Sequence, residues 1–383
     1  MKILFVIKSF AMKAGVERLM SDKMNYMAEQ GNEITLVTYE QGDHPMAFPL
    51  CSNIQHIDLD TRFFSLKRYA LLLRVIAVLK MKRVFKKRLQ KVVDSVQPDI
   101  IHTTTYAIHL VDIILGLKTT AKKTIESQVC YESILKETDF KGNYLLQTFA
   151  RFYDRITLKR LKSFDAFFAL TKGDASQWNR YVNNIYCVPN PLTCYPEKVK
   201  EHNRSHHRMI CAGRLNPQKG FDLLIEAFTL VADKCPDWHI DIFGSGDEEE
   251  FLRQKLRDNQ LEERIFIYPA TDNIYLEFQS SDFFVFSSRF EGWGLVLVEA
   301  MACGIPPVSF RCKYGPEDII TDGKDGLLAK DGDIYDLSDK ILWMINHPKE
   351  RIEMGQRART SALRFNKEIV VQRWIEIFHS LLS

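Results

Sequence analysis

The chain opens with a continuous run of apolar residues, followed by a turn and a segment with helical periodicity. Residues 1–10 (MKILFVIKSF) are apolar from position 3 to position 7, which is typical of a strand buried on both faces of a sheet. The run is too short for a secretory signal and lacks a small-residue cleavage site. Gly15 precedes an amphipathic segment, and residues 33–38 (EITLVT) form a second apolar run. The order strand, helix, strand predicts an α/β fold.

The same pattern returns late in the chain. Residues 282–288 (DFFVFSS) predict a buried strand, a glycine turn follows, and residues 295–302 (LVLVEAMA) predict an apolar helix. The N-terminus of such a helix carries free N–H groups and the positive end of the helix dipole. We therefore expect a phosphate to bind at the N–H groups near Gly294, Leu295 and Val296.

Two carboxylates flank this glycine turn. Glu291 precedes the predicted helix, and Glu299 lies on its second turn, where side chains lean back toward the helix N-terminus. Either residue alone has an ordinary explanation, Glu291 as a solvated loop acid and Glu299 as the partner of an arginine. Together they suit a ligand with paired hydroxyl groups, because a vicinal diol such as that of ribose offers two donors to a carboxylate.

A pair of cations follows another predicted strand, residues 208–213 (RMICAG). Arg214 comes directly after this strand, and Lys219 stands before an amphipathic segment. A diphosphate leaving group needs either a metal ion or fixed cations, and a guanidinium fork and an ammonium group suit phosphate oxygens. No D-x-D-like motif is placed to hold a metal, so we predict a diphosphate site without a metal. The alternative is a pair of surface cations with no ligand.

Length and composition indicate two domains in a reducing compartment. The 383 residues exceed what one hydrophobic core usually holds. We expect an N-terminal domain over residues 1–190, a polar linker over 191–206 and a C-terminal domain over 207–365. The eight cysteines are scattered, with no C-x-x-C pair and no histidine at zinc spacing. Such cysteines are typical of small buried residues in a reducing compartment.

Residues 61–93 contain no acidic residue but many Lys and Arg side chains, from Arg62 to Lys91. Arg74 and Lys80 bound the apolar run VIAVL, which is therefore too short to span a bilayer. A basic amphipathic segment is attracted to anionic lipid by about 1 kcal/mol per nearby cation. We expect residues 62–91 to contact an anionic membrane; the alternative is a core helix with a solvated basic face. Nucleic-acid binding is not expected, because interleaved stacking aromatics are absent.

Two of these patterns resemble a known family. The spacing E-G-x-G-x-x-x-x-E at 291–299 and the run G-R-L-x-x-x-K-G-F-D at 213–222 are similar to those of retaining GT-B glycosyltransferases of family 4 type, which include bacterial lipopolysaccharide, capsule and lipid-linked oligosaccharide enzymes. The resemblance implies two Rossmann-like domains that face each other across a cleft. It also implies that the C-terminal helix, residues 366–383, crosses back onto the first domain.

The resemblance assigns roles to residues that the patterns alone leave open. It implies that Glu291, Arg214 and Lys219 act in catalysis, that Arg214 and Lys219 hold the donor diphosphate, and that Glu299 holds the ribose. Gly15, in a loop similar to the family's G-G-x-E-R, would approach that diphosphate, although Ala14 replaces the first glycine. The resemblance also places Tyr268, Pro269 and Ala270 beside the base of the nucleotide (base-side residues). It makes His102 and Glu126 candidates for contact with the acceptor (acceptor-side candidates). All of these residues follow or end predicted strands.

The implied reaction is transfer of a hexose or N-acetylhexosamine, with retention, from a nucleotide diphosphate sugar, UDP in preference to GDP. The acceptor would be a lipid-linked or surface-polysaccharide glycan, including one on polyprenyl diphosphate. No metal and no separate cofactor would be needed. The basic region would place the enzyme in the cytoplasm, on the inner face of a bacterial cytoplasmic membrane. The alternatives are a sugar-nucleotide epimerase or phosphorylase of the same fold, and a catalytically dead binding protein.

Overall fold

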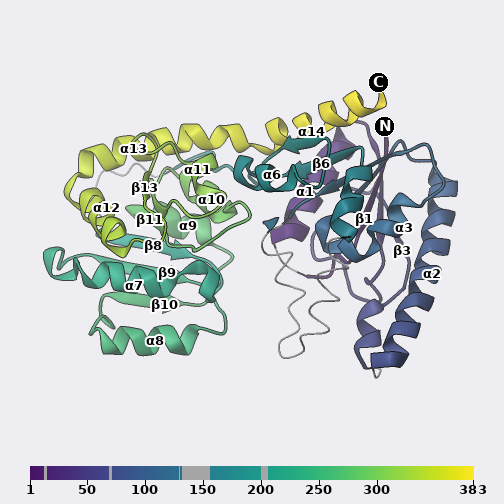
Figure 1. Ribbon diagram of the computed structural model, residues 1–383. Coiled ribbons are helices and arrows are strands. Elements are labelled where there is room, and N and C mark those ends of the chain that lie inside the picture. Colours follow the sequence, from purple (N-terminus) through teal and green to yellow (C-terminus); the bar gives the residue numbers. More distant parts are fainter. Residues whose placement is uncertain (13–14, 69–70, 129, 132–155, 200–205) are drawn as a thin grey trace. The chain divides into compact units, whose positions relative to one another are not determined.

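The protein forms two compact units, each built around its own parallel sheet. The computed structural model describes residues 1–12, 15–68, 71–128, 130–131, 156–199 and 206–383. Unit 1 consists of Met1–Thr193 together with Lys367–Ser383, and unit 2 consists of Cys194–Asn366. The chain therefore passes twice between the units, and its last helix belongs to the same unit as its first strand. Figure 1 labels many of the elements of both units.

Unit 1 contains a seven-stranded sheet with the strand order β3-β2-β1-β4-β5-β6-β7, and every pairing in it is parallel. The strands are β1 (Lys2–Ile7), β2 (Glu33–Thr38), β3 (Gln55–Asp58), β4 (Ile100–Thr104), β5 (Lys122–Glu126), β6 (Ala166–Ala169) and β7 (Ile185–Cys187). The helices are α1 (Gly15–Glu29), η1 (Phe63–Arg68), α2 (Leu71–Val96), η2 (Thr105–Leu110), α3 (Val111–Leu115), η3 (Leu161–Ser163), α6 (Lys172–Trp178) and α14 (Lys367–Leu382).

The two faces of this sheet carry separate hydrophobic cores, which explains the continuous apolar run of β1. Ile3 and Phe5 point into the core that contains α1 and α14. Leu4 and Val6 point into the opposite core, with α2, α3 and α6. Because successive side chains of a strand alternate between faces, a strand covered on both sides must be apolar at every position. The helix α14, yellow in Figure 1, packs beside α1 within unit 1.

Unit 2 contains a six-stranded parallel sheet in the order β10-β9-β8-β11-β12-β13. The strands are β8 (Arg208–Ala212), β9 (His239–Phe243), β10 (Ile265–Tyr268), β11 (Phe283–Phe286), β12 (Pro307–Phe310) and β13 (Leu327–Ala329). The helices are η4 (Pro217–Lys219), α7 (Phe221–Thr229), η5 (Ala232–Lys234), α8 (Glu249–Asp258), α9 (Ile274–Gln279), α10 (Leu295–Ala302), α11 (Pro316–Ile319), α12 (Ile334–Asn346), α13 (Pro348–Ala362) and η6 (Leu363–Phe365).

In each sheet the chain adds strands first on one side and then on the other, so the strand order has one switch point. This switch point indicates the edge of the sheet at which a ligand binds. In unit 2 the chain order runs outward from β8 to β10 on one side and from β11 to β13 on the other. In open α/β sheets, ligands gather outside the carboxyl ends of the strands at such a switch point. The loops that follow β8 and β11 carry Arg214, Lys219 and Glu291, so the sheet brings the predicted residues of unit 2 to one edge.

The basic segment of unit 1 forms the 26-residue helix α2. Its second half packs into the core through side chains such as Phe85 and Leu89. Its first half presents apolar side chains that are each more than half exposed, namely Leu73, Val75, Ile76 and Leu79. Across the ranges that the structure describes, no helix combines the length and the apolar character needed to cross a bilayer.

Candidate functional site

Lys219 and Glu291 form an ion pair in unit 2, although 72 positions separate them in the chain. Lys219 Nζ donates to Glu291 Oε1 at 2.7 Å, and Ser288 Oγ donates to the same oxygen at 2.6 Å. The Glu291 residue is 6% exposed, and these two donors provide hydrogen bonds to its buried carboxylate. Within the described part of the chain, Glu291 Oε2 has no hydrogen-bond partner. One carboxylate oxygen is thus fixed by the protein, and the second is able to accept from a ligand.

Two loops are joined backbone to backbone around this pair. Gly220, which follows Lys219, has a φ of +62°, and a Cβ there would lie 2.2 Å from the Ser287 carbonyl oxygen. Ser287 Oγ in turn donates to the Lys219 carbonyl at 3.0 Å. Arg289 N donates to the Gln218 carbonyl at 2.8 Å. The left-handed backbone and the close approach together require glycine, which explains the K-G pair in the sequence.

The glycine turn before α10 adopts the predicted geometry. Gly294 has a φ of +101° and precedes the helix, whose first residues are Leu295 and Val296. No side chain caps this helix start. A non-glycine residue would be strained at this φ. The backbone groups that we expected to bind a phosphate therefore lie beside the loop that carries Glu291.

Glu299 lies on the second turn of α10 and is almost fully buried. Tyr275 of α9 donates its hydroxyl to Glu299 Oε1 at 3.2 Å. A tyrosine hydroxyl is therefore one partner of this carboxylate.

Arg214 stands on the surface, one residue beyond Gly213 at the end of β8. Among the residues that the structure describes, none receives a hydrogen bond or ion pair from its guanidinium group. The loop that carries Arg214 is braced by the next strand end, since Leu215 N donates to the Ser245 carbonyl at 2.9 Å. Glu248 N donates back to the Leu215 carbonyl at 3.0 Å. The G-S-G turn at 244–246 therefore supports the loop that carries Arg214 through backbone hydrogen bonds.

The predicted base-side residues lie at the end of β10. Tyr268, Pro269 and Ala270 are all exposed. The Tyr268 ring stacks on Phe243 of β9 with centroids 5.1 Å apart. Partial burial and the nearby Asp241 carboxylate raise the pKa of Tyr268. These residues therefore present an exposed aromatic surface next to the loop that braces Arg214.

Gly15 begins α1 in unit 1. A Cβ added at Gly15 would meet no protein atom within 4 Å, so packing does not demand glycine there. Ala14, which replaces the family's first glycine, lies outside the described residues. The expectation that Gly15 approaches a diphosphate stays a prediction.

The structure corrects the expectation for His102 and Glu126. His102 was expected at the carboxyl end of its strand, but it is the third residue of β4 and is completely buried. Its ring packs edge-on against Phe5 and Trp374. The prediction failed because the β-branched residues after His102 extend the strand by two positions. Its side chain is therefore part of a core and is not available to an acceptor.

Glu126 ends β5 as predicted, but its carboxylate is buried in an ion pair. Lys23 of α1 donates Nζ to Glu126 Oε2 at 2.5 Å, and His102 Nε2 lies 3.4 Å from Glu126 Oε1. Burial would raise the pKa of Glu126, but the Lys23 ammonium and the His102 ring hold that pKa down, at about 2. Burial lowers the pKa of His102, so the ring is neutral. Glu126 is thus an ionised structural carboxylate.

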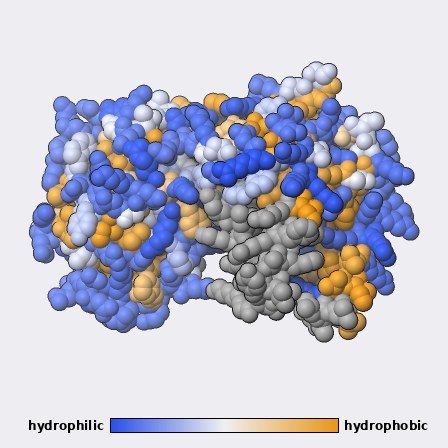
Figure 2. Space-filling view, in the orientation of Figure 1, coloured by the Kyte–Doolittle hydropathy of each residue, from blue (hydrophilic) through white to orange (hydrophobic). Residues whose placement is uncertain are grey.

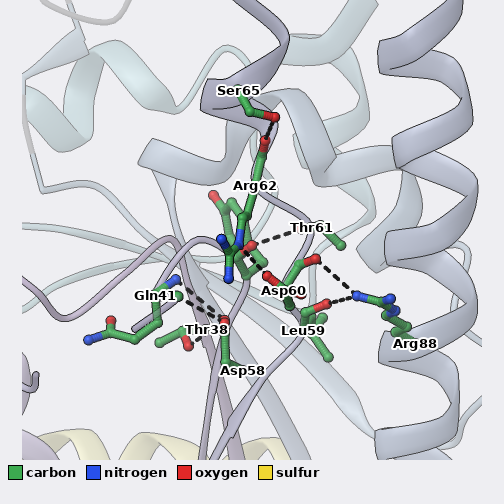
Figure 3. Close-up of polar contacts among 11 residues, drawn as sticks. Thr38, Gln41, Asp58, Leu59, Asp60, Thr61, Arg62, Ser65 and Arg88 are labelled. Atoms are coloured by element: carbon green, nitrogen blue, oxygen red, sulfur yellow. Dashed lines mark hydrogen bonds and ion pairs between the residues drawn. The ribbon is translucent and has the colours of Figure 1, made fainter. Parts of the chain in front are cut away.

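The basic region is more engaged within the protein than its composition indicates. Arg88 donates to the backbone carbonyls of Leu59 and Asp60, and Arg62 pairs with the Asp60 side chain (Figure 3). Asp58 in the same network accepts from Thr38 Oγ1 at 2.9 Å. Arg88 and Arg62 therefore anchor the segment between β3 and η1. Other cations of this region, such as Arg74 and Lys80, are exposed.

The sequence analysis did not predict the contacts of Ser288 and Lys23, which the structure shows. Ser288 fixes the Glu291 carboxylate, and its signal was local, a serine three positions before the glutamate. Lys23 was hidden within the apolar face of α1, between Met20 and Met27. In the described ranges, no three His, Cys, Asp or Glu side chains are grouped as metal ligands.

Comparison with known proteins adds family information. Residues 14–194 match the model described as Glycosyltransferase Family 4, and residues 197–361 match the model described as Glycosyl transferases group 1. The chain is 25% identical over 375 residues to an uncharacterized glycosyltransferase of Haemophilus influenzae. This match spans 97% of this chain and 98% of that protein.

Two further similarities involve Staphylococcus aureus. The chain is 32% identical over 200 residues to a poly(ribitol-phosphate) alpha-N-acetylglucosaminyltransferase, and this match spans 52% of the chain but only 40% of that protein. The solved structure of S. aureus TarM with fondaparinux, alpha-GlcNAc-glycerol and UDP superposes with a TM-score of 0.74 at 16% identity, over 98% of this chain and 99% of that one.

Proposed function

Since the chain belongs to the glycosyltransferases of the GT-B fold, we propose that it transfers a hexose or an N-acetylhexosamine from a nucleotide diphosphate sugar to a hydroxyl group. The donor is a UDP-sugar, and the configuration at the anomeric carbon is retained. The S. aureus relative is named for the transfer of alpha-N-acetylglucosamine, and the TarM structure contains UDP. These names support the donor class.

The observation that carries the proposal is the Lys219–Glu291 pair at the switch point of the unit 2 sheet, together with Arg214, which has no partner among the described residues. A diphosphate brings two or more negative charges, which suit two cations that flank it. Lys219 has three N–H donors and can bind a phosphate oxygen while it keeps Glu291 in place. Glu291 Oε2 then accepts from a hydroxyl of the transferred sugar.

The bond changes in this reaction balance without an enzymic base. The bond between the sugar C1 and the β-phosphate oxygen breaks, and its electron pair stays on the phosphate. The acceptor oxygen bonds to C1 on the same face, and its proton passes to the leaving phosphate. Arg214 and Lys219 stabilise the charge that develops on that phosphate, and this fixed electrostatic stabilisation replaces a metal ion. No separate cofactor takes part.

The other predicted residues hold the rest of the donor. The N–H groups at Gly294, Leu295 and Val296 face a phosphate, in keeping with the affinity of helix starts for anions. Glu299 accepts from the ribose hydroxyls, which can donate to a carboxylate. The exposed residues Tyr268, Pro269 and Ala270 cover the base, and Gly15 of unit 1 approaches the diphosphate.

The acceptor is a glycan on a lipid carrier or on a growing surface polysaccharide, and the protein binds the inner face of the cytoplasmic membrane. The first half of α2 supports this membrane contact. Its exposed apolar side chains stand among cations such as Arg74 and Lys80, and no acid occurs in 61–93. Figure 2 shows apolar surface gathered at that end of unit 1. Apolar insertion together with attraction to anionic lipid is the usual basis of interfacial binding.

The donor test is titration with UDP, GDP, ADP and CMP, followed by calorimetry or thermal denaturation. A nucleotide at a hundredfold its Kd should stabilise the wild type by about 2.7 kcal/mol. Arg214→Ala should lose most of this stabilisation. The matched control Arg257→Ala, which removes an exposed arginine on α8, should retain it. If none of the four nucleotides stabilises the wild type, the proposed function is wrong.

The membrane test is co-sedimentation with vesicles. The double variant Leu73→Glu/Ile76→Glu should release the protein from vesicles that contain phosphatidylglycerol, because it removes apolar contact and adds like charge. Arg88 is unsuitable for this test, since it supports the backbone at Leu59. A control variant Arg257→Glu should sediment as the wild type does. Equal sedimentation of the α2 variant and the wild type would exclude this face as the membrane contact.

A further inference from the structure

Asp222 and Arg289 form a second contact between the two loops that carry Lys219 and Glu291. Arg289 Nη1 donates to Asp222 Oδ1 at 2.7 Å, and Arg289 Nη2 donates to Asp222 Oδ2 at 2.6 Å. Two parallel bonds between a guanidinium and a carboxylate fix the orientation of the partners as well as their distance. Asp222 ends the run G-R-L-x-x-x-K-G-F-D at 213–222, yet the proposed reaction gives neither residue of this pair a role.

The Asp222–Arg289 pair lies beside the Lys219–Glu291 pair in the chain and joins the same two loops. Asp222 follows Lys219 by three residues, in the first turn of α7, and Arg289 precedes Glu291 by two residues. Arg289 Nη1 also donates to the Pro217 carbonyl at 2.9 Å. Pro217 and Asp222 lie on either side of Lys219 in the chain. One guanidinium group therefore holds both ends of the turn from which Lys219 extends.

This ion pair is too exposed to serve mainly as a source of stability. The side chains of Arg289 and Asp222 are 37% and 17% exposed, and solvent screens such pairs. The loops already have neutral contacts, for example from Gln218 Nε2 to the Phe290 carbonyl at 3.0 Å. The fork geometry of the pair is therefore better explained by a need for a fixed orientation than by a need for stability.

The Asp222 carboxylate also occupies the start of α7. Burial would raise the pKa of Asp222, but the Arg289 guanidinium and the backbone N–H groups of Asp222 and Leu223 hold that pKa below its ordinary value. A helix start attracts anions, and here the chain supplies its own. Helix α10 has neither an acid in its first turn nor a side-chain cap. The start of α10 is thus left for the donor phosphate that we place there.

An alternative role for Arg289 is that of a further cation for the diphosphate. The observed contacts argue against this role, because Asp222 engages both terminal nitrogens of the guanidinium and Pro217 engages one of them. Arg214, in contrast, has no partner among the residues that the structure describes. A swing of Arg289 toward a phosphate would leave the half-buried Asp222 carboxylate without its counter-charge, which is unfavourable.

We propose that Asp222 and Arg289 are a positioning pair, which holds the turn of Lys219 against the loop of Glu291. In this arrangement the Lys219 ammonium meets the diphosphate while Glu291 Oε2 meets the sugar of the same donor molecule. The inference rests on the proposed function, because that function assigns Lys219 and Glu291 to the donor. Neither Asp222 nor Arg289 touches the substrate, so the loss of either side chain acts through Lys219 and Glu291.

The first test is a double-mutant cycle of Asp222→Ala, Arg289→Ala and the double variant. The readout is UDP release from UDP-glucose or UDP-N-acetylglucosamine, with octyl glucoside or water as the acceptor. Each single variant should lower kcat about tenfold, and the double variant should be no slower, because both changes break one contact. The Kd of UDP should change less than about threefold, since Arg214 and the start of α10 still bind the nucleotide.

The variant Arg289→Lys separates the fork from the charge. It keeps a cation on a long stem, so it should fold as the wild type does even if the alanine variant is unstable. An ammonium group cannot make two parallel bonds to a carboxylate, so kcat should still fall about threefold or more. A kcat equal to that of the wild type would show that the orientation of the pair is not needed.

The matched control is Lys255→Ala. Lys255 pairs with Glu226 at 2.5 Å, with side chains 21% and 40% exposed, and this pair joins the same helix α7 to α8. It resembles the Asp222–Arg289 pair in length and exposure but lies outside the two loops. Its kcat should equal that of the wild type, and its Tm should match that of Arg289→Ala to within about 3 °C. A merely structural role of Arg289 would give the two variants the same kcat.

A second cycle tests whether the pair acts through Glu291. In the Glu291→Gln background the carboxylate to be positioned is already absent. Arg289→Ala should then lower kcat less than about threefold, against about tenfold in the wild type. A general loss of folded protein would instead lower kcat by the same factor in both backgrounds, and that result would contradict the proposal.

Two further results would overturn the inference. One is a kcat of Asp222→Ala and Arg289→Ala equal to that of the control. The other is a loss in the double variant equal to the product of the two single losses, which would make Arg289 an independent contact of the donor. In both cases UDP binding and UDP release by the wild type would leave the proposed function standing. A wild type that binds none of the nucleotides would instead contradict the proposed function.

Discussion

Each unit of the protein contains a lysine–glutamate pair of nearly the same length, and the two pairs differ in their surroundings. Lys23 and Glu126 in unit 1 are 2.5 Å apart and fully enclosed, with Trp374 lying against the ammonium group. Lys219 and Glu291 in unit 2 are 2.7 Å apart and partly open to solvent. In the first pair the protein satisfies the charges, whereas in the second a carboxylate oxygen stays open to a ligand. The surroundings of the two pairs, and not their composition, are the basis on which we assign a structural role to the first pair and propose a functional role for the second.

The largest effect is expected from breaking the enclosed pair. Glu126→Gln leaves the Lys23 ammonium buried without its counter-charge, which should lower the free energy of unfolding by about 3–5 kcal/mol. The double variant Lys23→Met/Glu126→Leu should recover most of that loss, because no charge is left buried. Urea unfolding followed by circular dichroism measures both variants. A single variant as stable as the wild type would show that the pair is not structural.

The open pair should respond in activity rather than in stability. Glu291→Gln should lower kcat by about 100–1000-fold, as removal of one electrostatic contact in an active site does. Its free energy of unfolding should fall by at most about 2 kcal/mol. Steady-state kinetics with the nucleotide sugar that the wild type uses, beside urea unfolding, gives both numbers. A large loss of stability with unchanged kcat would assign this pair to the fold.

A pH titration sharpens the comparison. The pKa of Glu126 is about 2 in the folded protein, against an ordinary value of 4.5. A depressed carboxyl pKa contributes stability that is present above about pH 4.5 and is lost as the pH falls toward 2. The wild type should therefore lose stability over this range relative to Lys23→Met/Glu126→Leu. Parallel curves of the two proteins, measured by urea unfolding at each pH, would contradict the ionised pair.

The smallest expected effect concerns the hydroxyl that supports the open pair. Ser288→Ala removes one of the two donors to Glu291 Oε1 and should lower kcat/KM by about tenfold, the worth of one hydrogen bond to a charged group. Ser280→Ala, which alters a half-buried serine directly after α9, serves as the control and should have the kinetics of the wild type. Equal kinetics of the two variants would show that Lys219 alone positions Glu291.

Local patterns allowed the sequence to predict the strand before Gly294 and the helix after it, because apolar runs and glycine breaks are read within a few residues. The fold and the glycosyltransferase family are likewise confirmed. The partner of Glu126 could not be predicted, since Lys23 lies 103 positions away. A cation within an apolar helical face was the only local hint.

The basic region shows a related limit. Counting cations in 61–93 cannot tell which of them the protein uses itself. Arg88 binds two backbone carbonyls, and Arg62 pairs with Asp60, so neither is simply a free surface charge. Which apolar side chains of α2 stay exposed and which enter the core could be seen only in the three-dimensional packing.

The return of α14 to unit 1 governs the order in which the nascent protein can mature on the ribosome. Unit 2 is one continuous stretch of chain and can fold as soon as it has emerged. Unit 1 must wait through the synthesis of Cys194–Asn366, which takes roughly 10–30 s at ~5–20 residues per second. Until then Phe168 lacks the Trp374 ring that stacks on it, and Lys23 lacks part of its enclosure. The incomplete unit 1 is thus the stage at which a chaperone would be needed.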